Sequence, residues 1–222
     1  MALILNLETA TTNCSVSLAK DGKLISIKEH NETGYSHSEN LHVFISECLK
    51  NASLLPNDLD AVAVSKGPGS YTGLRIGVSA AKGLCFALDI PLIAISTLRC
   101  MVEQLNVGEG FIIPMLDARR LEVYSAVFDK ERKEIRNTRA EIITPDSFED
   151  YVKEGPVYLA GSGATKCIDI LKHPNFVFEE NVIPSSKDLA VLSYESFINK
   201  EFENNAYFEP DYLKKFVSNL SK

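Results

Sequence analysis

The 222-residue sequence has no excess of basic residues and no long apolar run, and each absence excludes a class of protein. A net charge of −7 and a pI near 5.2 argue against a chain that alone grips a nucleic-acid backbone, which requires a basic face. The most apolar internal stretch, residues 84–95, contains Asp89 and Pro91 and is too short to span a bilayer. The apolar start ends at Glu8 without a charged leader, so we expect a soluble, cytoplasmic protein that binds no membrane.

The sequence also has no Cys-x-x-Cys pair of the kind found in redox motifs and zinc sites. Its five cysteines are widely spaced and mostly set among apolar residues: Cys14, Cys48, Cys85, Cys100 and Cys167. Buried free thiols in a reducing compartment explain this pattern best. The hydrophobic content of 45% is enough for a substantial core, in one larger domain or two smaller ones.

Strand and helix patterns follow one another in a fixed order in the first half of the chain. Apolar or alternating runs at residues 2–9, 15–19 and 24–30 predict three strands joined by short turns. A capping box at residues 36–39 then opens an amphipathic helix, whose apolar residues recur at helical spacing: Leu41, Phe44, Ile45, Cys48, Leu49 and Ala52. A short strand and a second helix complete a β-β-β-α-β-α unit.

The same order recurs beyond a hinge at residues 106–110. The pattern predicts strands at 111–116, 121–128 and 135–143, a helix from 144–146 with Pro145 in its first turn, a strand at 157–160 and a helix at 164–171. Two such units predict an α/β chain with a duplicated ribonuclease-H-like fold of the actin and hexokinase type. The predicted halves are residues 1–106 and 107–222, and in this fold type nucleotides bind in the cleft between the halves.

The glycine-rich stretch 66–75 joins a strand to the second helix of the first unit. It has neither the P-loop spacing nor the spacing of a dinucleotide-binding loop, so it gives little support to phosphate binding. Gly73, Gly77 and Ala81 place small residues along one face of the helix, although each glycine disfavours a helix by about 1 kcal/mol relative to alanine. Another backbone, of this chain or of a partner, should therefore approach that face closely.

Several stretches carry a resemblance to a known family, and the longest is GPGSYTGLRIG at residues 67–77. The others are LILNLETAT at 3–11, CSVSL at 14–18, HSENL at 37–41, DARRLEVY at 117–124 and EPDYL at 209–213. Together they resemble the bacterial TsaB family of threonylcarbamoyladenosine biosynthesis subunits, once labelled glycoprotease-like. The resemblance is strong over the first half and patchy in the second. One departure is Glu8, where the family usually has Asp.

The resemblance implies a duplicated actin-like fold and a role in adding a threonylcarbamoyl group to the adenosine next to the tRNA anticodon. It implies a non-catalytic scaffold and activator subunit, with no catalytic residues of its own. The related catalytic subunit TsaD would be its partner, and a TsaE-like ATPase would dock on the pair. ATP and a metal are then expected on the partner rather than as cofactors of this chain, and tRNA is expected to bind only within the complex.

The resemblance also implies that the first two helices pair with their counterparts in TsaD, and that the same helices could form a homodimer without it. The residues assigned to this contact are His37, Glu39, Leu41, Phe44, Ile45, Cys48, Tyr71, Gly73, Leu74, Arg75, Gly77 and Ala81. Gly77→Leu or Ala81→Trp should then abolish TsaD binding in a folded protein. The alternative role for both helix faces is to cover this chain's own sheet.

Enzyme functions remain as alternatives with weaker support. A stand-alone actin-like ATPase or kinase would use the turns at 9–13 and 117–120 and the turn at 161–163, which give a nucleotide-site hypothesis of Thr11, Asp117, Arg119, Gly161 and Gly163. Neither of the first two turns has the glycine that would let backbone amides close around a phosphate.

Metal and peptidase chemistry have less support still. The catalytic relative holds a metal with His-x-x-x-His, whereas His37 and His42 lie five residues apart and point to different helix faces, so no metal site is expected. No nucleophile and base occur at a peptidase spacing. A Cys-His pair built from Cys14 or Cys48 stays open, although nothing near either cysteine favours a thiolate.

Overall fold

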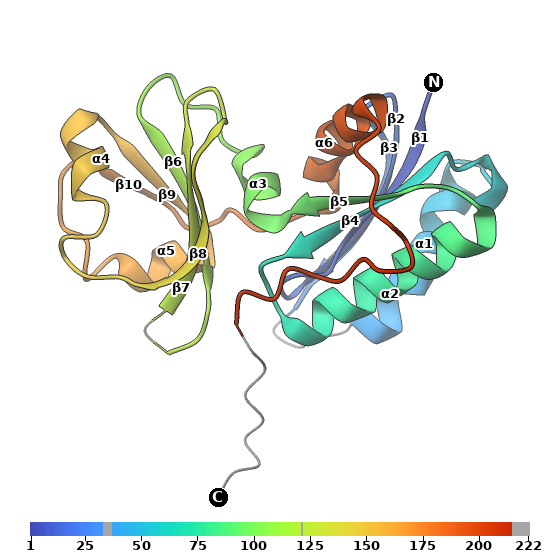
Figure 1. Ribbon diagram of the computed structural model, residues 1–222, viewed down its shortest axis with the longest axis horizontal. Coiled ribbons are helices and arrows are strands. Elements are labelled where there is room, and N and C mark those ends of the chain that lie inside the picture. Colours follow the sequence, from blue (N-terminus) through green and yellow to red (C-terminus); the bar gives the residue numbers. More distant parts are fainter. Residues whose placement is uncertain (33–36, 121, 215–222) are drawn as a thin grey trace, which may run out of the picture.

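The computed structural model describes residues 1–32, 37–120 and 122–214, which form two lobes, each built on a five-stranded sheet (Figure 1). The first sheet has the order β3-β2-β1-β4-β5 and contains β1 (Leu3–Glu8), β2 (Asn13–Lys20), β3 (Lys23–Asn31), β4 (Ala61–Gly67) and β5 (Leu92–Ser96). The second has the order β10-β9-β6-β7-β8 and contains β6 (Phe111–Asp117), β7 (Glu122–Asp129), β8 (Glu134–Ile142), β9 (Val157–Ala160) and β10 (Phe176–Glu179).

The two sheets share one topology. In each, three strands form an antiparallel meander, and the first strand of the meander then pairs in parallel with the fourth strand, which pairs in parallel with the fifth. Parallel neighbours require crossover connections, and the helices supply them. The duplicated ribonuclease-H-like fold predicted from the repeated pattern is confirmed, with each half extended to β-β-β-α-β-α-β-α.

Two helices cover one face of each sheet. The helices are α1 (His37–Asn51), α2 (Tyr71–Leu88), α3 (Thr97–Val102), α4 (Glu149–Glu154), α5 (Ser162–Cys167) and α6 (Ser186–Asn199), with a 3-10 turn at Pro56–Asp58. In Figure 1, α1 and α2 lie side by side against the first sheet, and their buried residues form its largest apolar cluster with β1, β2 and β4. The helices α4 and α5 contribute to the corresponding cluster on the second sheet.

The last helix of each half packs against the other half. Leu98 and Met101 of α3 lie in an apolar cluster with residues of β6 and β7, and Leu189 of α6 packs with Ile4 and other residues of the first sheet. Figure 1 shows α3 between the lobes and α6 on the face of the first sheet opposite α1 and α2. The division at residue 106 stays a prediction, and the apolar face of α6 lies in the core of the first lobe.

Three local predictions differ from the structure or fall outside it. The helix expected from 144–146 begins only at Glu149, because residues 145–148 form turns and Phe148 adopts a left-handed conformation with φ of 65°. Strand β10 was not predicted, because its four residues are only partly buried and show no clear alternation. The capping box at 36–39 includes Ser36, which lies outside the described residues.

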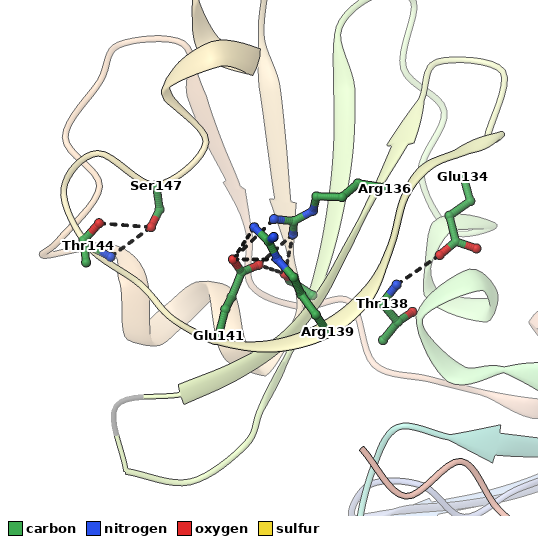
Figure 2. Close-up of polar contacts among 8 residues, drawn as sticks. Glu134, Arg136, Thr138, Arg139, Glu141, Thr144 and Ser147 are labelled. Atoms are coloured by element: carbon green, nitrogen blue, oxygen red, sulfur yellow. Dashed lines mark hydrogen bonds and ion pairs between the residues drawn. The ribbon is translucent and has the colours of Figure 1, made fainter. Parts of the chain in front are cut away.

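The outer strand β8 carries a polar cluster that no sequence pattern indicated. Figure 2 shows Arg136 and Arg139 converging on Glu141, with Arg136 Nη2 at 2.7 Å and Arg139 Nη2 at 2.8 Å from its carboxylate oxygens. Ser125 of β7 also donates to this carboxylate. Burial raises the pKa of Glu141, but the bonds from Arg136 and Ser125 outweigh burial and hold that pKa below its usual value. The bonds that Arg136 makes to Ser125 and Glu141 join β7 to β8.

Candidate functional site

The small-residue face of α2 packs against the turn that follows β1. A Cβ atom on Gly73 would overlap the Thr9 carbonyl oxygen, and one on Gly77 would overlap Thr9 Oγ1. The Thr9 hydroxyl donates to the Gly73 carbonyl over 2.8 Å, which joins helix and turn directly. The backbone that the glycines admit therefore belongs to this chain. Because a side chain at position 77 would meet Thr9 Oγ1, Gly77→Leu should disturb the fold itself as well as any partner contact.

The start of α2 is fixed to the same turn. The Ser70 amide donates to the Ala10 carbonyl over 2.7 Å, and Ser70 Oγ accepts from the Gly73 amide over 3.3 Å as the helix cap. A Cβ atom on Gly69 would overlap the Ala10 carbonyl oxygen, so this glycine too permits a close approach. The loop at 66–75 thus starts the helix and fixes its position, and the amides of Ser70, Gly73 and Leu74 donate within the chain.

The buried face of α1 covers the first sheet in the same way. His37 Nε2 lies 2.7 Å from the Thr11 carbonyl oxygen, and burial lowers the pKa of His37 although this hydrogen bond opposes the shift. The other residues on this face, together with those on the inner face of α2, are buried in this chain's own core: Leu41, Ile45, Cys48, Leu74 and Ala81. These side chains pack within this chain, and their exposed neighbours on the same helices offer more accessible surface. The assignment of the buried residues to a partner contact stays a prediction.

The exposed sides of α1 and α2 form an open groove with a volume of about 680 Å³. Among the described residues that line it, Arg75 alone carries a permanent charge, and most of the others are small or apolar: Ser38, His42, Tyr71, Thr72, Ile76, Ser79, Ala80, Gly83 and Leu84. Phe86 lies three residues beyond Gly83 on the same helix and is 85% exposed. An exposed phenylalanine beside an apolar groove is typical of an interaction surface.

The predicted contact residues split between the buried faces and this groove. Tyr71 and Arg75 line the groove, Glu39 is exposed on α1, and Phe44 is half-buried. Arg75 stacks on Tyr71, with its guanidinium carbon 5.2 Å from the ring centre and Nη1 donating to the phenol oxygen over 3.2 Å. The sequence analysis missed Ser79, Gly83 and Phe86, although they follow Arg75 by four, eight and eleven residues, a helical spacing that could have identified the outer face of α2.

Glu8, the carboxylate at the end of β1, is fully enclosed. One oxygen accepts from the Ala10 amide over 2.6 Å, and the other accepts from the Ser65 hydroxyl. Burial raises the pKa of Glu8 to about 7, although the Ser65 hydrogen bond opposes this rise. Both carboxylate oxygens therefore have partners inside the protein, and the group stabilises the turn after β1.

The residues of the nucleotide-site hypothesis have separate structural roles. Gly161 and Gly163 are buried against β6, where added Cβ atoms would lie 2.8 Å from Met115 atoms, so both glycines let α5 approach the sheet. Asp117 pairs with Lys166 at 2.7 Å and accepts from the Arg119 amide over 2.7 Å. The Thr11 carbonyl contacts His37, as described above. The space beneath the 161–163 turn is thus filled by protein.

The cysteines are all buried and carry free thiols. Burial raises the pKa of Cys14, Cys85 and Cys167 to about 11, and it raises the pKa of Cys48 and Cys100 as well. Neither Cys14 nor Cys48 is therefore a ready nucleophile. Over 1–32, 37–120 and 122–214, no group of three or more His, Cys, Asp or Glu side chains is placed to hold a metal, and no helix has the length and apolarity needed to cross a membrane.

Comparisons with known proteins agree with this architecture. The family model described as "TsaD: tRNA N6-adenosine threonylcarbamoyltransferase" matches residues 26–219. The tRNA threonylcarbamoyladenosine biosynthesis protein TsaB of Bacillus subtilis (strain 168) is 30% identical over 226 residues, covering 95% of this chain and 93% of that protein. The TsaB protein of Escherichia coli (strain K12) is 28% identical over 225 residues, covering 97% of this chain and 96% of that protein.

A solved structure gives the same result. A Pseudomonas aeruginosa protein described as uncharacterized, with similarity to peptidase YEAZ, superposes with a TM-score of 0.81 at 25% identity, covering 96% of this chain and all of that one. The matches therefore extend over nearly the whole chain and include α1, α2 and both sheets. The chain belongs to the family described as TsaD: tRNA N6-adenosine threonylcarbamoyltransferase, and within it to the TsaB proteins.

Proposed function

We propose that this chain serves tRNA threonylcarbamoyladenosine biosynthesis as a non-catalytic subunit that binds a TsaD-like catalytic relative through the groove between α1 and α2. The pathway follows from the names of its TsaB relatives. The observation that carries the binding role is the groove itself, whose described lining is small, apolar and nearly uncharged. The buried thiols and the enclosed carboxylate of Glu8 give no comparable support to catalysis by this chain.

The shape of the groove suits a helix pair. The outer face of α2 carries small side chains at Ser79 and Ala80 and none at Gly83, which lets another helix approach closely. Phe86 offers an apolar side chain beyond them. The matching family model is that of TsaD, so a TsaD-like protein shares the elements that build α1 and α2 here. Two such pairs can pack about a pseudo-twofold axis, because similar surfaces then meet.

The remaining parts of the reaction are assigned to the assembly. ATP, the metal and the chemistry belong to the TsaD-like subunit, a TsaE-like ATPase docks on the pair, and tRNA binds the complex. The net charge of −7 supports a shared rather than an independent tRNA contact. Without the partner, the same groove supports a homodimer.

The test uses two glycines where a side chain meets open space. No heavy atom lies within 4 Å of a Cβ built on Gly83, in the groove, or on Gly108, outside it. Gly83→Trp should therefore fold, fill the groove and weaken binding to the TsaD-like subunit of the same organism by at least 100-fold in titration calorimetry. Gly108→Trp is the matched control and should bind like the wild type. Wild-type affinity in a folded Gly83→Trp would show that the partner docks elsewhere.

A further inference from the structure

The residues after α6, 203–214, form a strap that lies along the first lobe and reaches the second. Its first part is tied to β5 and α2: the Glu203 amide donates to the Leu92 carbonyl over 2.9 Å, and Lys82 Nζ donates to the Phe208 carbonyl over 2.9 Å. The Asn205 side chain returns a bond to the Lys82 carbonyl over 3.2 Å. Figure 1 shows this segment leaving α6, passing β5 and α2, and running toward the second sheet.

The middle of the strap crosses the loop that starts α2. The Asp211 amide donates to the Lys66 carbonyl over 2.8 Å, and the Asp211 carboxylate lies 3.5 Å from Lys66 Nζ. A Cβ on Gly67 would lie 3.1 Å from the Asp211 carbonyl oxygen, so the strap follows the loop backbone closely. Tyr212 then stacks on Tyr71, the first residue of α2, with ring centres 4.7 Å apart and planes at 37°.

The strap also contacts the turn between β6 and β7. Lys214 Nζ donates to the Ala118 carbonyl over 3.0 Å, forms an ion pair with Glu122 and lies 5.7 Å from the centre of the Tyr124 ring. The position of Tyr212 is therefore set from both sides, by the first lobe through Asp211 and by the second through Lys214.

The stack continues into the groove. Tyr212 lies against Tyr71, and Tyr71 both receives the hydrogen bond of Arg75 and lies beneath its guanidinium group. Arg75 is the permanently charged side chain of the described groove lining, and its long chain would otherwise sample many rotamers. A side chain ordered before binding loses less entropy when a partner docks.

We propose that Tyr212 is a positioning residue for the docking groove: through the ring of Tyr71 it holds Arg75 in the orientation that the partner meets. This inference rests on the proposed function, because the partner is the TsaD-like subunit. It gives the strap a role in affinity in addition to its role in packing. Tyr212 acts only through Tyr71 and Arg75, so it need not touch the partner.

Three strap variants and one groove variant test this role by titration calorimetry with the TsaD-like subunit. Tyr212→Ala should weaken binding roughly three- to tenfold, the range expected for one aromatic pair. Tyr212→Phe keeps the ring and should restore wild-type affinity. Tyr207→Ala removes an exposed tyrosine of the same strap, 84% accessible, and should change nothing.

A double-mutant cycle separates positioning from packing. In an Arg75→Ala background, Tyr212→Ala should cause no further loss of affinity, while its effect on the melting temperature should persist. An equal loss of affinity in both backgrounds would overturn the positioning role. Wild-type affinity in Tyr212→Ala would also overturn the positioning role. If Gly83→Trp still failed to bind, the groove would remain the docking surface.

Discussion

The buried carboxyl group of Glu8 should make the stability of this protein fall as the pH rises. Burial raises the pKa of Glu8 to about 7 in the folded chain, against an ordinary value of 4.5, with the Ser65 hydrogen bond acting in the opposite direction. Between these two values the folded protein holds a proton that the unfolded chain releases. The stabilisation is therefore fully present below about pH 4.5 and is lost as the pH rises through about 7.

The difference of 7 − 4.5, about 2.5 pKa units, sets the magnitude. At 1.36 kcal/mol for each unit, the full effect is about 3 kcal/mol, of which about 2.5 kcal/mol is lost between pH 5 and pH 8. A typical domain has a total stability of about 5–15 kcal/mol, so this loss is measurable in urea. Asp188 adds a smaller effect of the same sign, because burial raises its pKa to about 6.

Glu8→Gln isolates the contribution of this carboxyl group. The substitution keeps an oxygen for the Ala10 amide and removes the titration, so the free energy of unfolding should fall less between pH 5 and pH 8 than in the wild type, by about 2.5 kcal/mol. Urea unfolding at both pH values measures this difference. Glu195→Gln, at an exposed position on α6, is the control and should keep the wild-type pH dependence. Identical pH dependence in Glu8→Gln and the wild type would refute the reasoning.

Three further perturbations follow from single contacts. Gly77→Ala should lower the free energy of unfolding by about 1–3 kcal/mol, because its Cβ displaces the Thr9 hydroxyl. Gly83→Ala should raise the free energy of unfolding by up to about 1 kcal/mol, because alanine favours a helix and its Cβ meets open space. Urea unfolding measures both changes, and equal shifts in the two variants would contradict the packing described for α2. Arg136→Leu leaves Glu141 without its main partner and should cost roughly 3 kcal/mol, while a wild-type melting temperature would mean that the cluster contributes little. The five buried thiols should react with a disulfide reagent only as the protein unfolds, so rapid labelling of the native protein would contradict their burial.

Periodicity in the sequence predicted which residues are buried but not what buries them. Leu41, Ile45 and Cys48 recur at helical spacing, and the structure confirms that they share a buried face. The same spacing would arise whether a sheet of this chain or a helix of a partner covered that face. The bond from Cys48 Sγ to the Val16 carbonyl identifies the neighbour of α1, as the contacts of Thr9 with Gly73 and Gly77 identify that of α2. These partners lie more than thirty and more than sixty positions apart, so a local sequence pattern does not reveal them.

Other features depended on the path of the whole chain. The order of strands repeats in the sequence, so the duplicated fold was predictable from β1 to β9. The exchange of α3 and α6 between the lobes was not, because an apolar helix face fits either sheet equally well. The strap was not predictable either, because the neighbours of Phe208 and Tyr212, which are the first core and Tyr71, are set by the return of α6 to the first lobe.

In the proposed role of the groove, the two faces of α2 separate stability from recognition within one helix. On the inner face, Gly73 and Gly77 lie directly against Thr9, so the helix cannot shift without breaking the Thr9 hydrogen bond. On the outer face, Gly83 meets open space, so a side chain there changes what the groove presents without displacing the helix. Substitutions at Gly77 should therefore reduce stability and affinity together, because they move the whole helix. Substitutions at Gly83 should reduce affinity without reducing stability. A Gly77 variant that lost stability but kept wild-type affinity would show that the groove and the core are not held by the same rigid element.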